Sequence, residues 1–240
     1  QLLSALSMLV GIPEVLKLLS LPGTLVSIDA MGCQRAIAQQ IVEQGGDYLL
    51  QVKGNQPALS SELQTLFRQA LAQPEHGPLE PAPGPRVQRY EHTDAGHGRI
   101  ELRKTMICNE LPQDMSAAKL WSALRSVVMV EATRQHATTG AGSTERRYYI
   151  SSRVLDAEQA AGAVRAHWLI ENQLHWVLDM TFGEDACTVR TQHAAHNLAV
   201  IRHFAFNLLR RAKDKRSLRM RQRRCDWDRD YRERLVRGAF

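Results

Sequence analysis

Hydrophobic and polar positions follow two different periods in the first part of the chain. Residues 24–29 and 47–53 are short apolar runs that contain β-branched and aromatic residues, which is typical of buried strands. Residues 34–44 and 58–72 repeat apolar side chains at helical spacing. The order strand, helix, strand, helix predicts an α/β sheet in which the two strands pair in parallel. We therefore expect residues 1–73 to form the first part of an α/β core.

A proline-rich linker then leads into a part dominated by strand patterns. The predicted strands are 86–92, 97–108, 125–131 and 145–151. Residues 116–124 have the pattern of a short helix, and residues 135–144 are rich in Gly, Thr and Ser and predict a loop. We expect residues 74–152 to be a β-rich insertion.

Helical spacing returns after this insertion and continues toward the end of the chain. Asp156 and Gln159 have the spacing of an N-terminal capping box, and the apolar pattern that follows predicts a helix to Met180. A second long helix is expected from about residue 193. These patterns predict C-terminal helices over residues 153–212.

One carboxylate follows the first predicted strand directly. Asp29 ends the run that begins at residue 24, at the sheet edge where ligands and catalytic groups gather in open α/β sheets. The other interpretation of this residue is a carboxylate that caps a turn. Lys53 ends the second strand in the same way.

A second carboxylate, Glu171, lies within the long predicted helix. His167 and His175 are each four residues away, so the three side chains share one helical face. This arrangement fits a catalytic or metal-binding acid, and it also fits a buried polar helix whose groups are satisfied. The spacing differs from the HExxH zinc motif, and imidazole is a poor ligand for Mg²⁺. Trp168 and Trp176 on the same helix are expected to be core anchors rather than platforms on which bases stack.

Charge is concentrated at the end of the chain. Residues 210–240 contain 13 Lys or Arg and 5 Asp or Glu, whereas the other 209 residues contain 18 and 20. A basic block on a nearly neutral body indicates a polyanion partner, most simply nucleic acid, although a solvated tail without a partner has the same composition. We expect a basic tail over 213–240. The candidate phosphate-binding residues are Arg210, Arg211, Lys213, Lys215, Arg216, Arg219, Arg221, Arg223 and Arg224.

Other classes of protein find little support. No apolar run approaches the ~18 residues that predict a transmembrane helix, so no membrane partner is expected. The four cysteines are scattered without a CxxC pair, which predicts neither a zinc ribbon nor a disulfide framework and favours a reducing, cytoplasmic setting. The chain contains no glycine-rich phosphate loop, which weighs against a nucleotide-dependent enzyme.

Several long strings together resemble the H-repeat-associated insertion-sequence transposases. The matching strings are Ser27–Gln34, Asp47–Gln56, His97–Glu101, Arg165–Asp179, Phe182–Ala186 and His196–Arg202. The resemblance implies a mixed, RNase H-like sheet flanked by helices and a triad of three acidic residues. It places Asp29 as the second acid and Glu171 as the third, both as ligands of Mg²⁺ or Mn²⁺, with two ions in the complete enzyme.

The same resemblance implies cleavage and transfer of double-stranded DNA at transposon ends and target, in a bacterial cytoplasm, with a homodimer on the DNA. His167, Asn172, His175, Asp179, Lys53 and Arg165 are then expected to contact DNA or to orient the acids. The first acid has no counterpart, because the chain matches only the last two thirds of such a transposase. We therefore expect an N-terminal truncation and little catalysis by this chain.

Two alternatives remain open at this point. The chain fits a catalytically inactive, DNA-binding remnant of a transposase. It also fits a metal-dependent hydrolase that uses His167, Glu171 and His175 without DNA. Glu184 and Asp185 are further candidates for the third acid, but they follow a glycine and are expected to belong to a turn.

Overall fold

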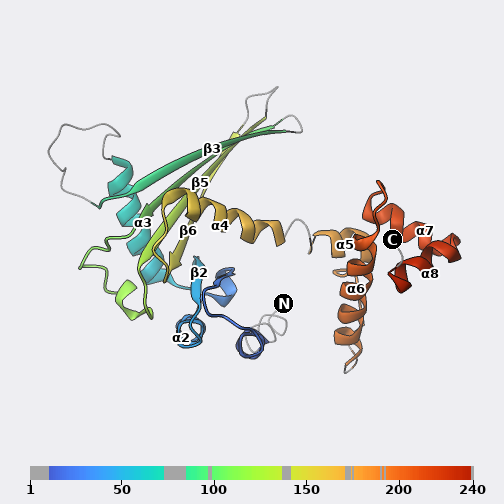
Figure 1. The fold of residues 1–240 in the computed structure, drawn as a ribbon. Helices are drawn as coiled ribbons and strands as arrows, with labels where there is room; N and C mark the ends of the chain where they lie inside the picture. Colours follow the sequence, from blue (N-terminus) through green and yellow to red (C-terminus); the bar gives the residue numbers. More distant parts are fainter. Residues whose placement is uncertain are drawn as a thin grey trace. The chain divides into compact units, whose positions relative to one another are not determined.

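The computed structural model describes residues 11–72, 85–96, 99–136, 142–170, 174, 176–189, 191 and 193–238. The chain divides into two compact units, residues 1–167 and 168–240, and each is described by itself. Figure 1 shows the sheet of the first unit and the helices of the second. The predicted division into four parts stays a prediction of the sequence.

A single mixed sheet organises the first unit. Its strands are β1 (Leu25–Ile28), β2 (Asp47–Val52), β3 (Gln88–Gly96), β4 (Arg99–Cys108), β5 (Ser126–His136) and β6 (Gly142–Ser151). The order is β1-β2-β6-β5-β4-β3, in which β1 and β2 are parallel and every other pair is antiparallel. The predicted α/β class, with a mixed sheet flanked by helices, is therefore confirmed. The strands predicted as an insertion continue the same sheet, because β6 pairs with β2.

Two helices provide much of the apolar side of this unit. They are α2 (Arg35–Glu43) and α3 (Pro57–Ala72), both within a residue of the predicted positions. The helical spacing places these buried side chains on one face of each helix: Ile37, Ala38 and Ile41 on α2, and Leu59, Leu63, Leu66, Phe67 and Ala70 on α3. They join the core formed with buried residues of β2, β4 and β5. Each fully buried aliphatic or aromatic side chain contributes roughly 1.5–3 kcal/mol to stability, so these two faces hold the helices to the sheet.

Two predictions for the strand-rich part are corrected by the structure. The predicted loop at 135–144 is strand at its described ends, because Gln135 pairs with Gly142 and Thr133 with Thr144. Cross-strand pairing, including a 3.1 Å hydrogen bond between the two threonine hydroxyls, outweighs the local turn composition. The predicted helix at 116–124 is only the 3₁₀ turn η2 (Ala118–Leu120). Glu62 of α3 caps this turn by accepting hydrogen bonds from the amides of residues 117 and 118.

Helix α4 (Ala157–Ile170) begins at the predicted capping box. The backbone N–H of Gln159 donates to the Asp156 carboxylate at 2.7 Å, and the backbone N–H of Asp156 donates to the side-chain oxygen of Gln159 at 3.1 Å. Helix α5 (Trp176–Phe182) ends before Gly183, whose φ is +60°. Whether α4 and α5 form the single predicted helix lies outside the described residues.

The described part of the second unit is mainly helical between Trp176 and Arg237. Its helices are α5, α6 (Ala194–Arg211), α7 (Leu218–Trp227) and α8 (Arg229–Arg237). Leu209, Ala212, Tyr231 and Leu235 form a small core, with Phe182, Leu218 and Cys225 packed against it. The segment predicted as a basic tail is therefore folded, and the prediction missed α7 and α8. No helix among the described residues combines the length and hydropathy that a membrane crossing requires.

Candidate functional site

Asp29 lies directly after β1, at the carboxyl edge of the parallel pair β1–β2. Its backbone continues the extended strand, with φ −68° and ψ 179°. Oδ1 accepts hydrogen bonds from the amides of Met31 at 3.2 Å and Gly32 at 3.5 Å. Asp29 is exposed, and Oδ2 has no hydrogen-bond donor among the described residues. The carboxylate thus caps the turn with one oxygen, and the other oxygen accepts no hydrogen bond from the described residues.

Two side chains from the turn after β2 hold the turn that follows Asp29. The side-chain amide of Asn55 donates to the backbone carbonyl of Ala30 at 2.6 Å, and the side-chain amide of Gln56 donates to the backbone carbonyl of Cys33 at 3.0 Å. Burial raises the pKa of the Cys33 thiol to about 12, so this thiol remains protonated and is not a nucleophile. We did not predict a role for Asn55 or Gln56 from the sequence. The signal was present, because both belong to the string Asp47–Gln56.

Helix α4 reaches the same strand through His167. His167 Nδ1 lies 3.2 Å from the hydroxyl of Ser27 on β1. Ser27 and Asp29 are two residues apart along extended backbone, so their side chains project to the same side of the sheet. The contact therefore places the C-terminal part of α4 on the side of the sheet to which Asp29 points. Glu171, Asn172 and His175 lie outside the described residues.

Gln51 is a buried polar side chain on the neighbouring strand. Leu50 is the register partner of Ile28 in the parallel pair β1–β2. Gln51 directly follows Leu50 and Asp29 directly follows Ile28, so the two residues have equivalent positions on neighbouring strands. Only 2% of Gln51 is exposed, and its side-chain nitrogen has no hydrogen-bond partner in the described part of the chain. An unsatisfied buried donor costs roughly 1–3 kcal/mol, which is unusual for a side chain that serves packing alone.

Arg165 on α4 is paired with a carboxylate of β3. Its guanidinium lies 3.2 Å from Asp94, which also accepts hydrogen bonds from Arg103 at 2.6 Å and contacts His92 at 3.0 Å. The hydrogen bond from Arg103 is the main reason that the pKa of Asp94 lies below its usual range. Lys53 directly follows β2 and is exposed, with no carboxylate partner among the described residues. Asp179 lies in α5, in the second unit.

The predicted phosphate-binding residues divide into two groups. Arg221 is largely buried, lies 2.7 Å from Asp214, and donates to the carbonyl of Leu209 at 2.8 Å. Arg224 pairs with Asp228 at 2.8 Å and lies over the ring of Tyr231. Arg216 also pairs with Asp214, and the Arg210 guanidinium lies over Phe206. The remaining residues are exposed without such partners in the described structure: Arg211, Lys213, Lys215, Arg219 and Arg223.

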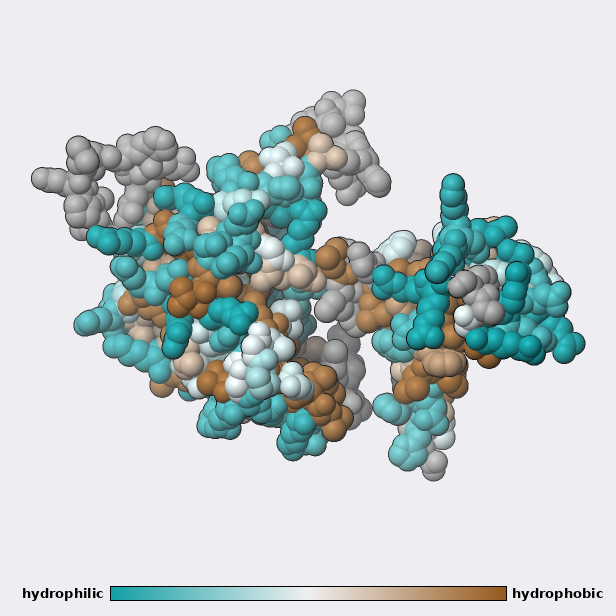
Figure 2. All heavy atoms as spheres, viewed as in Figure 1, coloured by the Kyte–Doolittle hydropathy of each residue, from teal (hydrophilic) through white to brown (hydrophobic). Residues whose placement is uncertain are grey.

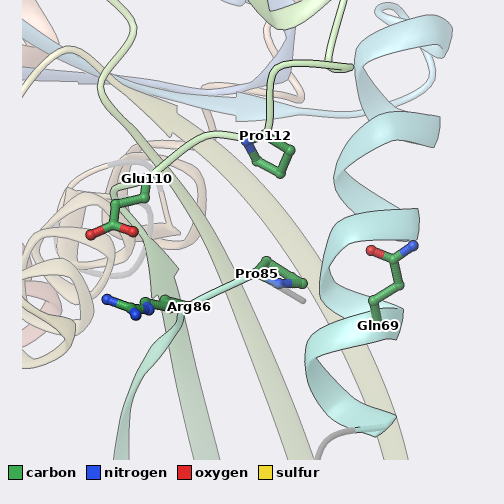
Figure 3. A pocket seen from close by; sticks show the side chains of 5 residues that line it. All are labelled: Gln69, Pro85, Arg86, Glu110 and Pro112. Carbon is green, nitrogen blue, oxygen red and sulfur yellow. The ribbon is translucent and has the colours of Figure 1, made fainter. Parts of the chain in front are cut away.

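The first unit also has a hollow on its surface. An open pocket of about 590 Å³ is lined by Gln69, Pro85, Arg86, Glu110 and Pro112 (Figure 3). Arg86 and Glu110 are exposed, and the lining contains none of the predicted site residues. Its shape and lining give no indication of a catalytic centre.

Of the two predicted metal ligands, the described residues contain only Asp29. No group of three or more His, Cys, Asp or Glu side chains within them is arranged to hold a metal ion. Asp29 nevertheless fits one ligand of Mg²⁺, because its free carboxylate oxygen is the kind of donor that this ion prefers. The other predicted ligand, Glu171, lies outside the described residues.

Comparison with a family model and comparison with individual proteins both identify a family of transposases. Residues 9–208 match the family model described as "Transposase DDE domain", and the chain belongs to this family. Two proteins of Escherichia coli K12, "H repeat-associated putative transposase YhhI" and "Putative protein YbfL", are each 36% identical over 232 residues, which is 95% of this chain and 59% of theirs. "Putative transposase YncI" of Escherichia coli O157:H7 is 38% identical over 205 residues, 85% of this chain and 50% of its own.

These relatives confirm the predicted resemblance to H-repeat-associated transposases. The chain spans between half and three fifths of the length of these curated relatives. No solved structure matches it.

Proposed function

We propose that the chain is part of a DDE transposase with an RNase H-like core, which cleaves and transfers DNA strands during movement of an insertion sequence. Membership of the transposase DDE domain family supports the general class. The placement of Asp29 at the carboxyl edge of β1–β2 supports the position of one acid. The substrate is double-stranded DNA, at the ends of the element and at the target, and a homodimer acts on it in the bacterial cytoplasm.

The contact between His167 and Ser27 is the observation on which this proposal rests. It joins the helix that precedes Glu171 to the strand that precedes Asp29. Four residues of chain span at most about 14 Å and two residues about 7 Å. Along the chain the contact is therefore four residues from Glu171 and two residues from Asp29, although 141 residues lie between the two acids in the sequence.

The side chains of the site then have distinct roles in the proposal. Asp29 and Glu171 hold Mg²⁺ or Mn²⁺, with one oxygen of Asp29 fixed by the turn amides and the other free. The metal, when bound, stabilises the attacking and leaving oxygens of the phosphodiester. Lys53 is assigned to the DNA backbone, and Arg165 is assigned to it in competition with its ion pair to Asp94. In the complete enzyme a further aspartate completes the triad and two ions are held.

The neighbouring polar residues orient these groups. His167 fixes α4 against β1 through Ser27. Asn172, His175 and Asp179 are assigned to orienting Glu171 or to contacting DNA. The side-chain nitrogen of Gln51, which has no hydrogen-bond partner among the described residues, would be satisfied by donating to a carboxylate of the site.

Metal binding by the 240-residue chain tests the proposal directly. We expect weak Mn²⁺ binding, measured by electron paramagnetic resonance, that Asp29→Asn and Glu171→Gln each reduce at least tenfold. The control is Glu158→Gln, which removes a carboxylate from the first turn of α4, more than three turns before residue 171. Undiminished Mn²⁺ binding in both site variants would overturn the assignment of the acids.

Strand cleavage separates the proposal from its alternatives. We expect little or no nicking of duplex DNA by this chain, because the resemblance implies a first aspartate that has no counterpart here. Efficient nicking that Glu171→Ala abolishes would contradict that expectation. Zinc retained through dialysis, with no affinity for DNA, would instead favour a metal-dependent hydrolase.

A further inference from the structure

Helix α7 has two faces that use arginine differently. Leu218, Arg221 and Cys225 are spaced three and four residues apart and face the small core of the second unit. Arg219, Arg223 and Trp227 are spaced four residues apart on the other side, and all three are exposed. One face therefore packs, and the other is presented to solvent.

The cations of the outer face are free. Among the described residues, neither Arg219 nor Arg223 has a carboxylate partner, whereas Arg221 and Arg224 on the same helix pair with Asp214 and Asp228. Lys213 and Lys215, just before the helix, are also exposed. Hydrophilic side chains cover the region of α7 and α8 in Figure 2. Because the inner arginines are neutralised, the outward positive charge of this helix comes from the outer ones, beside the exposed carboxylate of Asp226.

An aromatic side chain ends this cationic row. Trp227 is the last residue of α7, and 67% of its surface is exposed. An indole usually buries most of its surface and is enriched at binding interfaces. Exposed guanidinium groups followed by an exposed aromatic ring are the combination that binds single-stranded nucleic acid, with cations on phosphates and a base stacked on the ring.

We propose that the outer face of α7, formed by Arg219, Arg223 and Trp227, binds DNA beside an unpaired base. The arginines contact successive phosphates, and Trp227 stacks on a base that has left the duplex. The family match ends at residue 208, before α7, so family membership does not assign this face. The inference rests on the proposed action on DNA, and it specifies the form of DNA that this unit holds.

The first test compares two double variants of the full chain that remove the same charge. Arg219→Gln/Arg223→Gln removes two free cations from α7. Arg229→Gln/Arg237→Gln removes two exposed cations from α8, both of which pair with Glu233. Binding is measured by fluorescence anisotropy of labelled DNA in EDTA, so the outcome does not depend on metal binding or cleavage. Circular dichroism verifies that both variants are folded.

We expect the α7 variant to lose tenfold or more in affinity at about 0.1 M salt, with a salt slope shallower by roughly 1.8 on a duplex. The α8 variant should lose less than threefold. Equal losses in the two variants would show that only bulk charge matters and would overturn the assignment of this face.

The second test separates the base from the backbone. Trp227→Ala should weaken binding to a duplex with a single-stranded overhang roughly tenfold, leave binding to the blunt duplex within twofold, and be rescued by Trp227→Phe. Asp226, the exposed carboxylate next to Trp227, opposes phosphate binding, so Asp226→Asn should strengthen binding to both DNAs. An equal effect of Trp227→Ala on both DNAs, or an effect on self-association alone, would contradict base stacking.

The outcome can be distinguished from failure of the proposed function. If Asp29→Asn and Glu171→Gln leave Mn²⁺ binding unchanged while the α7 variants still lose DNA affinity, only the catalytic proposal fails. If metal binding responds as expected and the α7 variants bind DNA normally, only this inference fails.

Discussion

The arginines of strands β3–β6 and those of α7 illustrate two uses of the same side chain. On the strands, guanidinium groups pair with carboxylates of the same or a neighbouring strand, and the pairs are Arg103 with Asp94 and Glu101, Arg134 with Glu101, Arg146 with Glu131 and Arg147 with Glu145. On α7, Arg221 and Arg224 are paired in this way, whereas Arg219 and Arg223 are not. The number of basic residues in a segment therefore exceeds the number of cations that are left without a carboxylate partner.

The strongest test of this comparison uses two arginines of one helix. Arg221→Met removes a largely buried cation and leaves Asp214 without its main partner, so we expect a loss of about 3 kcal/mol in local stability. Arg223→Met removes an exposed cation and should cost less than about 0.5 kcal/mol.

Hydrogen exchange of the α7 amides measures the difference, which should be a roughly 100-fold faster exchange in the Arg221 variant. Similar exchange rates in the two variants would show that the distinction between paired and free arginines has no energetic basis.

In the native chain, acid should weaken the interaction between Asp214 and Arg221, because it protonates the Asp214 carboxylate. Burial by itself raises the pKa of Asp214, but hydrogen bonds from the Arg216 amide, the Arg221 guanidinium and the Tyr231 hydroxyl together lower it to about 2. A carboxylate with a lowered pKa stabilises the folded state above its unfolded pKa of about 3.9 and loses that contribution as pH falls toward 2.

We therefore expect Asp214→Asn to be destabilised relative to the native chain from pH 5 to pH 8. The difference should shrink below about pH 4 and approach zero near pH 2. Urea unfolding of the two chains across this range measures it. A stability difference that does not depend on pH would show that the carboxylate charge of Asp214 is not the source of its effect.

The smallest effect is expected at the ion pair between α4 and β3. Asp94→Asn weakens contacts to Arg165 and Arg103 that are partly exposed, and such pairs contribute about 0.2–1 kcal/mol each. The native chain and the variant should therefore differ by less than about 2 kcal/mol in urea unfolding, and by less still at high salt. A larger loss would indicate that Asp94 fixes α4 more firmly than an exposed pair can.

Local sequence patterns were sufficient to predict much of the fold and the position of Asp29 after a strand. The periods of residues 24–72 placed β1, α2, β2 and α3, and the capping box placed the start of α4. Asp29 was placed at a strand end because the apolar run stops there. Each of these features depends on residues that are close together in the sequence.

Features that depend on distant partners could not be predicted in this way. The contact between Ser27 and His167 joins residues 140 positions apart. The pairing of Thr133 with Thr144 decides that a Gly- and Thr-rich segment is strand. Trp176, predicted as a core anchor, is 60% exposed, because helical spacing does not tell which side of a helix meets a partner. Arg221 and Arg223 look alike in the sequence, and only the position of Asp214 distinguishes them.

The position of β6 has a consequence for how this fold tolerates change. β6 pairs with β2 on one side and with β5 on the other, and α4 begins six residues after its end. The chain therefore returns to the centre of the sheet before it enters the helix, whatever the length of the hairpins beyond β5. Strands β3 and β4 can therefore lengthen or shorten at the ends far from β6. Such changes leave the start of α4 in place, because β6 stays paired with β2, the neighbour of β1.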